Sequence, residues 1–114
     1  MAITTTWKVN DMTHVDADGG VIKAYWTCTA LSDTTPVYSA IEGGKLLCTY
    51  DASASGFIAY ASLTEANVLG WIYDSLKEGS ETAAQAKARI EANRTARVQN
   101  QIDRAATQAE GVPW

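Results

Sequence analysis

The sequence predicts an α+β protein: a small antiparallel sheet of three or four strands covered by a helix, then a long C-terminal helix and a docking tail. Three observations predict this class. Residues 22–30 alternate between two sets of side chains, as in a half-buried strand. Residues 68–76 instead carry apolar side chains at helical spacing. Residues 81–109 contain nine alanines and neither Gly nor Pro, so their helix propensity is high.

The first strand is expected at residues 3–9, where Thr and Val suit a pleated surface and Trp7 adds a large apolar side chain. The Asn, Asp and Gly residues of 10–20 predict a long hairpin connection. In the next strand the alternation predicts which side chains face the core: Ile22, Trp26 and Cys28. Lys23 lies on the opposite face, which is exposed or interfacial.

Two more strands are expected at residues 37–41 and 45–50. Gly43-Gly44 between them indicates a bulge or a tight turn. Residues 51–56 are small and polar, which is typical of a loop. Residues 3–50 are therefore expected to form an antiparallel meander.

A covering helix is expected at residues 65–78, with Thr64 as its N-cap and Gly79 as its C-cap. Its apolar stripe should bury four side chains against the sheet: Val68, Trp71, Ile72 and Leu76. Trp71 is then expected in the core together with Trp7 and Trp26.

A second helix is expected at residues 81–109, capped by Ser80. It has few large aliphatic side chains, and at 1.5 Å per residue it would be about 43 Å long, more than the width of such a domain. We therefore expect two parts, a sheet and helix unit at 1–80 and a helical arm at 81–114 that contacts another copy. The alternative is an arm lying along its own sheet. The candidate interface residues are Ile90, Val98, Ile102, Pro113 and Trp114.

Trp114 follows Pro113 and belongs to no strand or helix pattern. It is either a frayed end or an anchor that enters a pocket on its own domain or on a neighbouring subunit. Trp is the residue type most enriched among interface hot spots.

The charge is unevenly distributed along the chain. Residues 1–80 hold nine acids and four bases, whereas residues 81–114 hold four acids and five bases. With a net charge of −4 and only dilute basic residues, we expect no nucleic-acid partner. No apolar run is long enough to span a bilayer, and residues 1–6 do not read as a signal peptide, so no membrane partner is expected.

No catalytic, cofactor-binding or metal site is predicted. The acids of His14-Val15-Asp16-Ala17-Asp18 resemble the start of a calcium loop, but Val21 and Thr27 stand where that loop needs Gly and Glu. The single histidine lies in a loop and no nucleophile elbow is present, which disfavours a catalytic triad. Cys28 and Cys48 have no metal spacing; they are expected to be free thiols, with a cross-strand disulfide as the alternative.

Several segments together resemble small tailed-phage proteins of unknown function, many of them marine. The matching segments are Thr5–Val9, Ala24–Thr27, Phe57–Trp71 and Pro113-Trp114. The most specific part is Leu-Thr-Glu-x-x-Val-x-Gly-Trp, at residues 63–71. This chain departs from those proteins in its long Ala- and Arg-containing helix, since their tails are richer in proline.

The resemblance implies phage origin and a place in the virion. We therefore expect a structural or accessory protein of a capsid, neck or tail, not an enzyme, with other virion proteins and copies of itself as partners. The alternative is a non-virion phage protein that binds a host protein during infection, for which the acidic domain is suited. A small enzyme is the remote third option.

Overall fold

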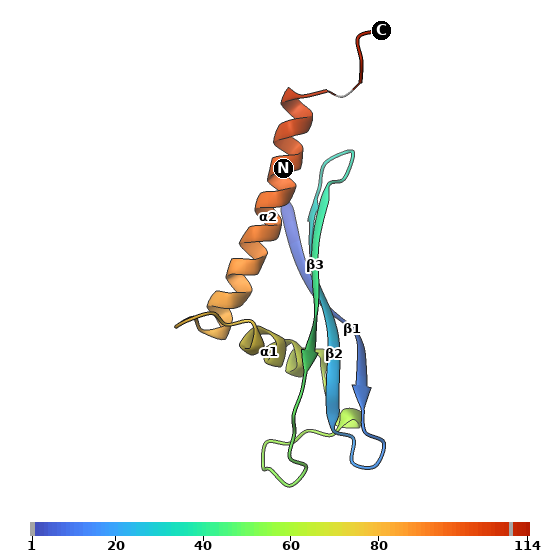
Figure 1. The fold of residues 1–114 in the computed structure, drawn as a ribbon, viewed down its shortest axis with the longest axis vertical. Coiled ribbons are helices and arrows are strands. Elements are labelled where there is room, and N and C mark those ends of the chain that lie inside the picture. Colours follow the sequence, from blue (N-terminus) through green and yellow to red (C-terminus); the bar gives the residue numbers. More distant parts are fainter. Residues whose placement is uncertain (1, 110) are drawn as a thin grey trace.

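The computed structural model describes residues 2–109 and 111–114, and its α+β architecture confirms the predicted class (Figure 1). The elements are β1 (Ile3–His14), β2 (Val21–Ser32), β3 (Ser39–Leu47), the short 3-10 helix η1 (Tyr60–Ser62), α1 (Glu65–Ser75) and α2 (Ala83–Thr107). The strands form one antiparallel sheet in the order β1-β2-β3. Both helices pack on the same face of the sheet, and the molecule is elongated, 68 × 31 × 22 Å.

β1 continues five residues beyond the predicted end at residue 9, because the polar residues after Val9 lie in a bulged strand and not in a turn. The register shifts between Val9 and Asp11, and again between Thr13 and His14. The second shift leaves Ile22 without a partner in β1. The same shift turns the side chains at this end of β2 to the opposite faces of the sheet, so that Val21 is buried and Ile22 is 39% exposed. The prediction that Ile22 faces the core was therefore wrong, while Trp26 and Cys28 are buried as predicted.

The two strands predicted at 37–41 and 45–50 form one continuous strand, β3. Gly43-Gly44 lies within it, opposite Thr27 and Trp26 of β2. A Cβ on Gly44 would lie 2.8 Å from Cζ2 of Trp26, so the absence of a side chain makes room for the indole ring. The glycine pair therefore serves packing and not a turn.

α1 begins after Thr64, whose side chain accepts a hydrogen bond from the Asn67 backbone in a capping box, as the predicted N-cap requires. The prediction that the helix runs to residue 78 with Gly79 as its C-cap was wrong. The helix ends at Ser75 with Leu76 as its C-cap, and Gly79, with φ +56°, lies in the link to α2. Val68 and Ile72 are fully buried against the sheet, whereas Trp71 and Leu76 are half-buried at the margin of this core.

α2 begins after Thr82, not after the predicted Ser80, because Thr82 and Gln85 form a capping box. The helix lies along its own sheet, which is the alternative that the sequence left open. Ile90 joins the core cluster that contains Trp26 and Val68, so the helix base shares a core with the 1–80 region. Among the described residues, no helix is long and apolar enough to cross a membrane.

Candidate functional site

The face of the sheet turned away from the helices, the outer face, is covered by no described element. It exposes five large apolar side chains: Ile22, Tyr25, Leu31, Ile41 and Leu47. Ile41 and Leu47 are 61% and 70% exposed, and most of the positions between the five are Thr or Lys. Several large apolar side chains exposed on one face of a small protein indicate a protein-binding surface.

The two edges of the sheet are partly closed by side chains of the helices. Gln101 of α2 donates to the Ser39 carbonyl at 2.9 Å, and Arg94 donates to the Ile41 carbonyl at 3.3 Å. On the opposite edge the Val9 N–H donates to the Glu65 carboxylate at 3.0 Å. These bonds occupy groups that an added strand would need, so a partner finds the outer face more accessible than the edges.

A layer of charged and polar groups lies between α2 and the sheet. Arg94, only 9% exposed, pairs with Glu42 at 3.5 Å, and Glu91 accepts from the Trp7 indole N–H at 2.9 Å. Burial first, and then the nearby Glu91 and Glu42 carboxylates, raise the pKa of the Cys28 thiol to about 11. This cysteine is therefore held as an unreactive thiol.

Both cysteines are free, as predicted. The Cys48 N–H donates to the Ile22 carbonyl at 2.9 Å, so Cys48 lies opposite Ile22. Cys28 of β2 lies opposite Glu42 of β3 in the strand register. Six strand positions separate Ile22 from Cys28, roughly 20 Å at 3.3 Å per residue, which is far beyond the reach of about 7 Å for a disulfide.

At pH 8, iodoacetamide is expected to modify Cys48 of the native chain and to spare Cys28. Cys48 is partly exposed, whereas Cys28 is fully buried with its pKa near 11. Mass spectrometry of tryptic peptides should find one alkylated thiol in buffer and two in urea. Equal modification of both in buffer would contradict the buried position of Cys28.

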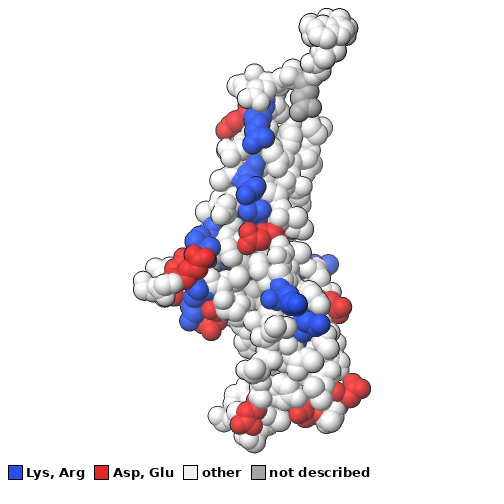
Figure 2. Space-filling view, viewed as in Figure 1, with Lys and Arg blue, Asp and Glu red and all other residues white. Residues whose placement is uncertain are grey.

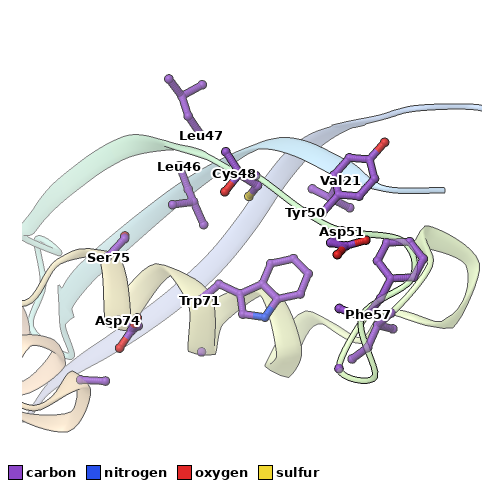
Figure 3. Close-up of a pocket in the computed structure, with 16 residues that line it drawn as sticks. Val21, Leu46, Leu47, Cys48, Tyr50, Asp51, Phe57, Trp71, Asp74 and Ser75 are labelled. Carbon is purple, nitrogen blue, oxygen red and sulfur yellow. The ribbon is translucent and has the colours of Figure 1, made fainter. Parts of the chain in front are cut away.

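An apolar cavity of about 740 Å³ lies between α1 and the segment at 48–58, and we call it the Trp71 pocket (Figure 3). The Trp71 indole projects into it from α1, and Phe57 and Tyr50 approach from the loop. Asp51 and Asp74 are its acidic members. This pocket was not predicted from the sequence; the half-buried Trp71 and the small residues of the loop form it together.

The loops at this end of the molecule are fastened to one another. The Tyr50 hydroxyl donates to the Asp18 carboxylate at 3.0 Å, and the His14 ring stacks on Tyr60 with centroids 3.8 Å apart. A Cβ on Gly20 would lie 2.1 Å from Cζ of Tyr50, so the tyrosine ring packs directly on the glycine where the two loops meet. Within residues 2–109 and 111–114, no three His, Cys, Asp or Glu side chains are grouped so that they could hold a metal ion.

The candidate interface residues fall into two groups. Ile90 and Val98, at 3% and 0% exposure, pack inside their own chain and so lie on no free surface, because α2 is docked on the sheet. Ile102 is half-buried, and Pro113 and Trp114 are exposed. Residues 108–114 follow α2, and we call them the tail; its described residues, 108–109 and 111–114, lie at the opposite end from the 48–58 loop (Figure 1).

The two ends of the molecule differ in the sign of their exposed charges. Figure 2 shows basic side chains along the upper part of α2 and acidic ones around the loops at the other end. Arg97 and Arg104 are exposed and form no ion pair with a described residue. The loop end carries Asp16, Asp18 and Asp51.

Comparison with known proteins gives one match. The profile of a family described as a domain of unknown function (DUF7936) matches residues 2–114, nearly the whole chain. No curated protein and no solved structure matches the chain.

Proposed function

The chain belongs to the DUF7936 family of unknown function, and we propose that it is a structural or accessory subunit of a phage particle, present in many copies and acting through protein contacts. The observation that carries this proposal is the outer face of the sheet, where five large apolar side chains are exposed. Burial of such side chains on a partner supplies about 25 cal/mol for each Å² removed from water.

The form of the outer face also favours a protein partner over a small molecule. Its apolar side chains are spread over two neighbouring strands and are interleaved with Thr and Lys, so they make a broad surface and not a cavity. Ile41 lies opposite Thr29, and Leu47 lies opposite Lys23. A surface of apolar centres with polar neighbours is typical of protein interfaces.

The resemblance to small tailed-phage proteins supports the virion as the place of action. A phage capsid, neck and phage tail are each assembled from repeated subunits, which need surfaces for protein contacts. We propose that other virion proteins and further copies of this chain are the partners.

The test is mass spectrometry of purified particles carrying either the natural chain or the double variant Ile41→Glu, Leu47→Glu. Both side chains are more than half exposed, so the variant should fold normally. Its incorporation should fall at least about tenfold, because two charges would be buried in the contact. The matched control is Ala92→Glu, Ala96→Glu, which places the same charges on exposed positions of α2.

Two results would count against the proposal. Absence of the natural chain from particles would refute the virion role. Normal incorporation of the Ile41→Glu, Leu47→Glu variant would refute the outer face as the contact.

A further inference from the structure

We propose that Trp114 of one copy inserts into the Trp71 pocket of a second copy, so that the subunits join head to tail. This inference rests on the proposed role as a repeated subunit, and it names a contact between copies that is separate from the outer face.

The tail presents an unburied anchor. Trp114 is 93% exposed and Val112 is 66% exposed, and neither packs on its own chain. Pro113 between them restricts the backbone, which lowers the entropy lost when the segment becomes ordered on binding. A large aromatic side chain on a short, stiffened segment suits insertion into a preformed pocket.

The Trp71 pocket suits an indole ring. Its volume of about 740 Å³ lies within the roughly 300–1,000 Å³ range of pockets that bind small molecules, so an indole ring fits inside it. Its aromatic walls are Trp71, Tyr50 and Phe57, the last two with ring centroids 5.7 Å apart (Figure 3). A further aromatic ring can pack against them in the tilted or edge-to-face arrangements that such rings prefer.

The tail cannot fill the pocket of its own chain. Ala83, the first residue of α2, lines the pocket, and the helix then runs straight away from it to Thr107 (Figure 1). At 1.5 Å per residue those two residues are about 36 Å apart. Residues 108–114 span at most about 25 Å when fully extended. A Trp114 ring that enters this pocket therefore comes from another copy.

The charges of the two ends favour the same pairing. Arg97 and Arg104 precede the tail, whereas Asp51 borders the pocket and the exposed Asp16 and Asp18 lie in the loops at the same end. Asp74 also borders the pocket but is already paired with Lys77 at 2.7 Å. When the tail of one copy approaches the pocket of the next, exposed arginines approach an acidic end, and this attraction guides the encounter. Because tail and pocket are different surfaces, the contact repeats from copy to copy and builds a ring or a filament.

Two single variants separate the two halves of the contact. Trp114→Ala removes the anchor and keeps the pocket. Gly70→Phe fills the pocket and keeps the tail, because Gly70 lines the pocket and a Cβ there meets nothing within 4 Å. Gly70→Ala is the matched control, since a methyl group leaves most of the pocket open.

The measurement is sedimentation velocity of the purified full chain, in which Leu31→Glu and Ile41→Glu neutralise the outer face throughout, because neither residue lines the pocket. The parent and Gly70→Ala should form larger species as concentration rises. Trp114→Ala and Gly70→Phe should each associate at least about thirtyfold more weakly, as expected for a hot-spot residue. An equimolar mixture of the two variants should form one-to-one dimers and nothing larger. The tail of Gly70→Phe can enter the pocket of Trp114→Ala, and the dimer then has neither an intact tail nor an open pocket left for a third copy.

Alkylation of Cys48, which lines the pocket, gives an independent reading that does not need the Gly70→Phe variant to fold. Its rate should fall with rising concentration of the parent chain and stay constant for Trp114→Ala. A parent chain that stays monomeric, or a Trp114→Ala variant that assembles and protects Cys48 like the parent, would overturn the inference. Neither result bears on incorporation into particles, so the proposed function is judged separately.

Discussion

Trp26→Ala is expected to lower the free energy of unfolding by about 3–5 kcal/mol. Trp26 is 5% exposed, its ring lies 5.4 Å from that of Trp7, and it fills the space over Gly44. The same core holds Val68 of α1, so the loss weakens the contact between sheet and helix as well. Urea denaturation followed by far-UV circular dichroism measures the change.

The neighbouring residue gives the matched control. Tyr25→Ala removes an aromatic ring from the opposite face of the same strand, where the side chain is 38% exposed, and it should cost less than about 1 kcal/mol. Gly44→Ala adds a second check, since its cost of about 1–3 kcal/mol should largely disappear in the Trp26→Ala background. Equal losses for Trp26→Ala and Tyr25→Ala would mean that the two faces have been assigned wrongly.

Ile90→Ala is expected to cost about 2–5 kcal/mol, independently of protein concentration. Ile90 is 3% exposed and joins the core cluster of the sheet and α1, so its removal leaves a cavity inside one chain. Chemical denaturation at two protein concentrations measures the loss and separates a core role from an interface role.

Ile41→Ala is the control of the same residue type, at 61% exposure on the outer face, and it should change stability by less than about 1 kcal/mol. If Ile90→Ala left stability unchanged and weakened association instead, α2 would be an arm between copies and its docking on the sheet would be refuted.

The sequence predicts elements best where the deciding contacts are local. Thr64 was predicted as the N-cap of α1, and the residue that completes its capping box lies three positions away. Val68 and Ile72 follow from helical spacing alone. The alternation in β2 also indicates the outer face, because it places Tyr25 and Trp26 on opposite faces of the sheet.

The predictions fail where distant segments decide. In the sequence Gly43-Gly44 resembles a turn, but the pair lies inside β3 because the Trp26 ring of the neighbouring strand occupies the space of a Gly44 side chain. Ile22 is turned outward by a register shift that depends on how β1 pairs with β2. The Trp71 pocket likewise forms only when a loop and a helix come together, so no short sequence pattern predicts it.

The docking of α2 on the sheet has a consequence for how the chain is made. The strands are complete once Leu47 has left the ribosome, but Val98, which is buried under the helix, follows roughly 50 residues later. At about 5–20 residues per second this delay is roughly 3–10 s. During that time the apolar inner face, including Trp7 and Trp26, has no α2 above it. We therefore expect chaperones that bind exposed apolar strands to bind the newborn chain, and we expect a chain whose synthesis stalls before α2 to aggregate.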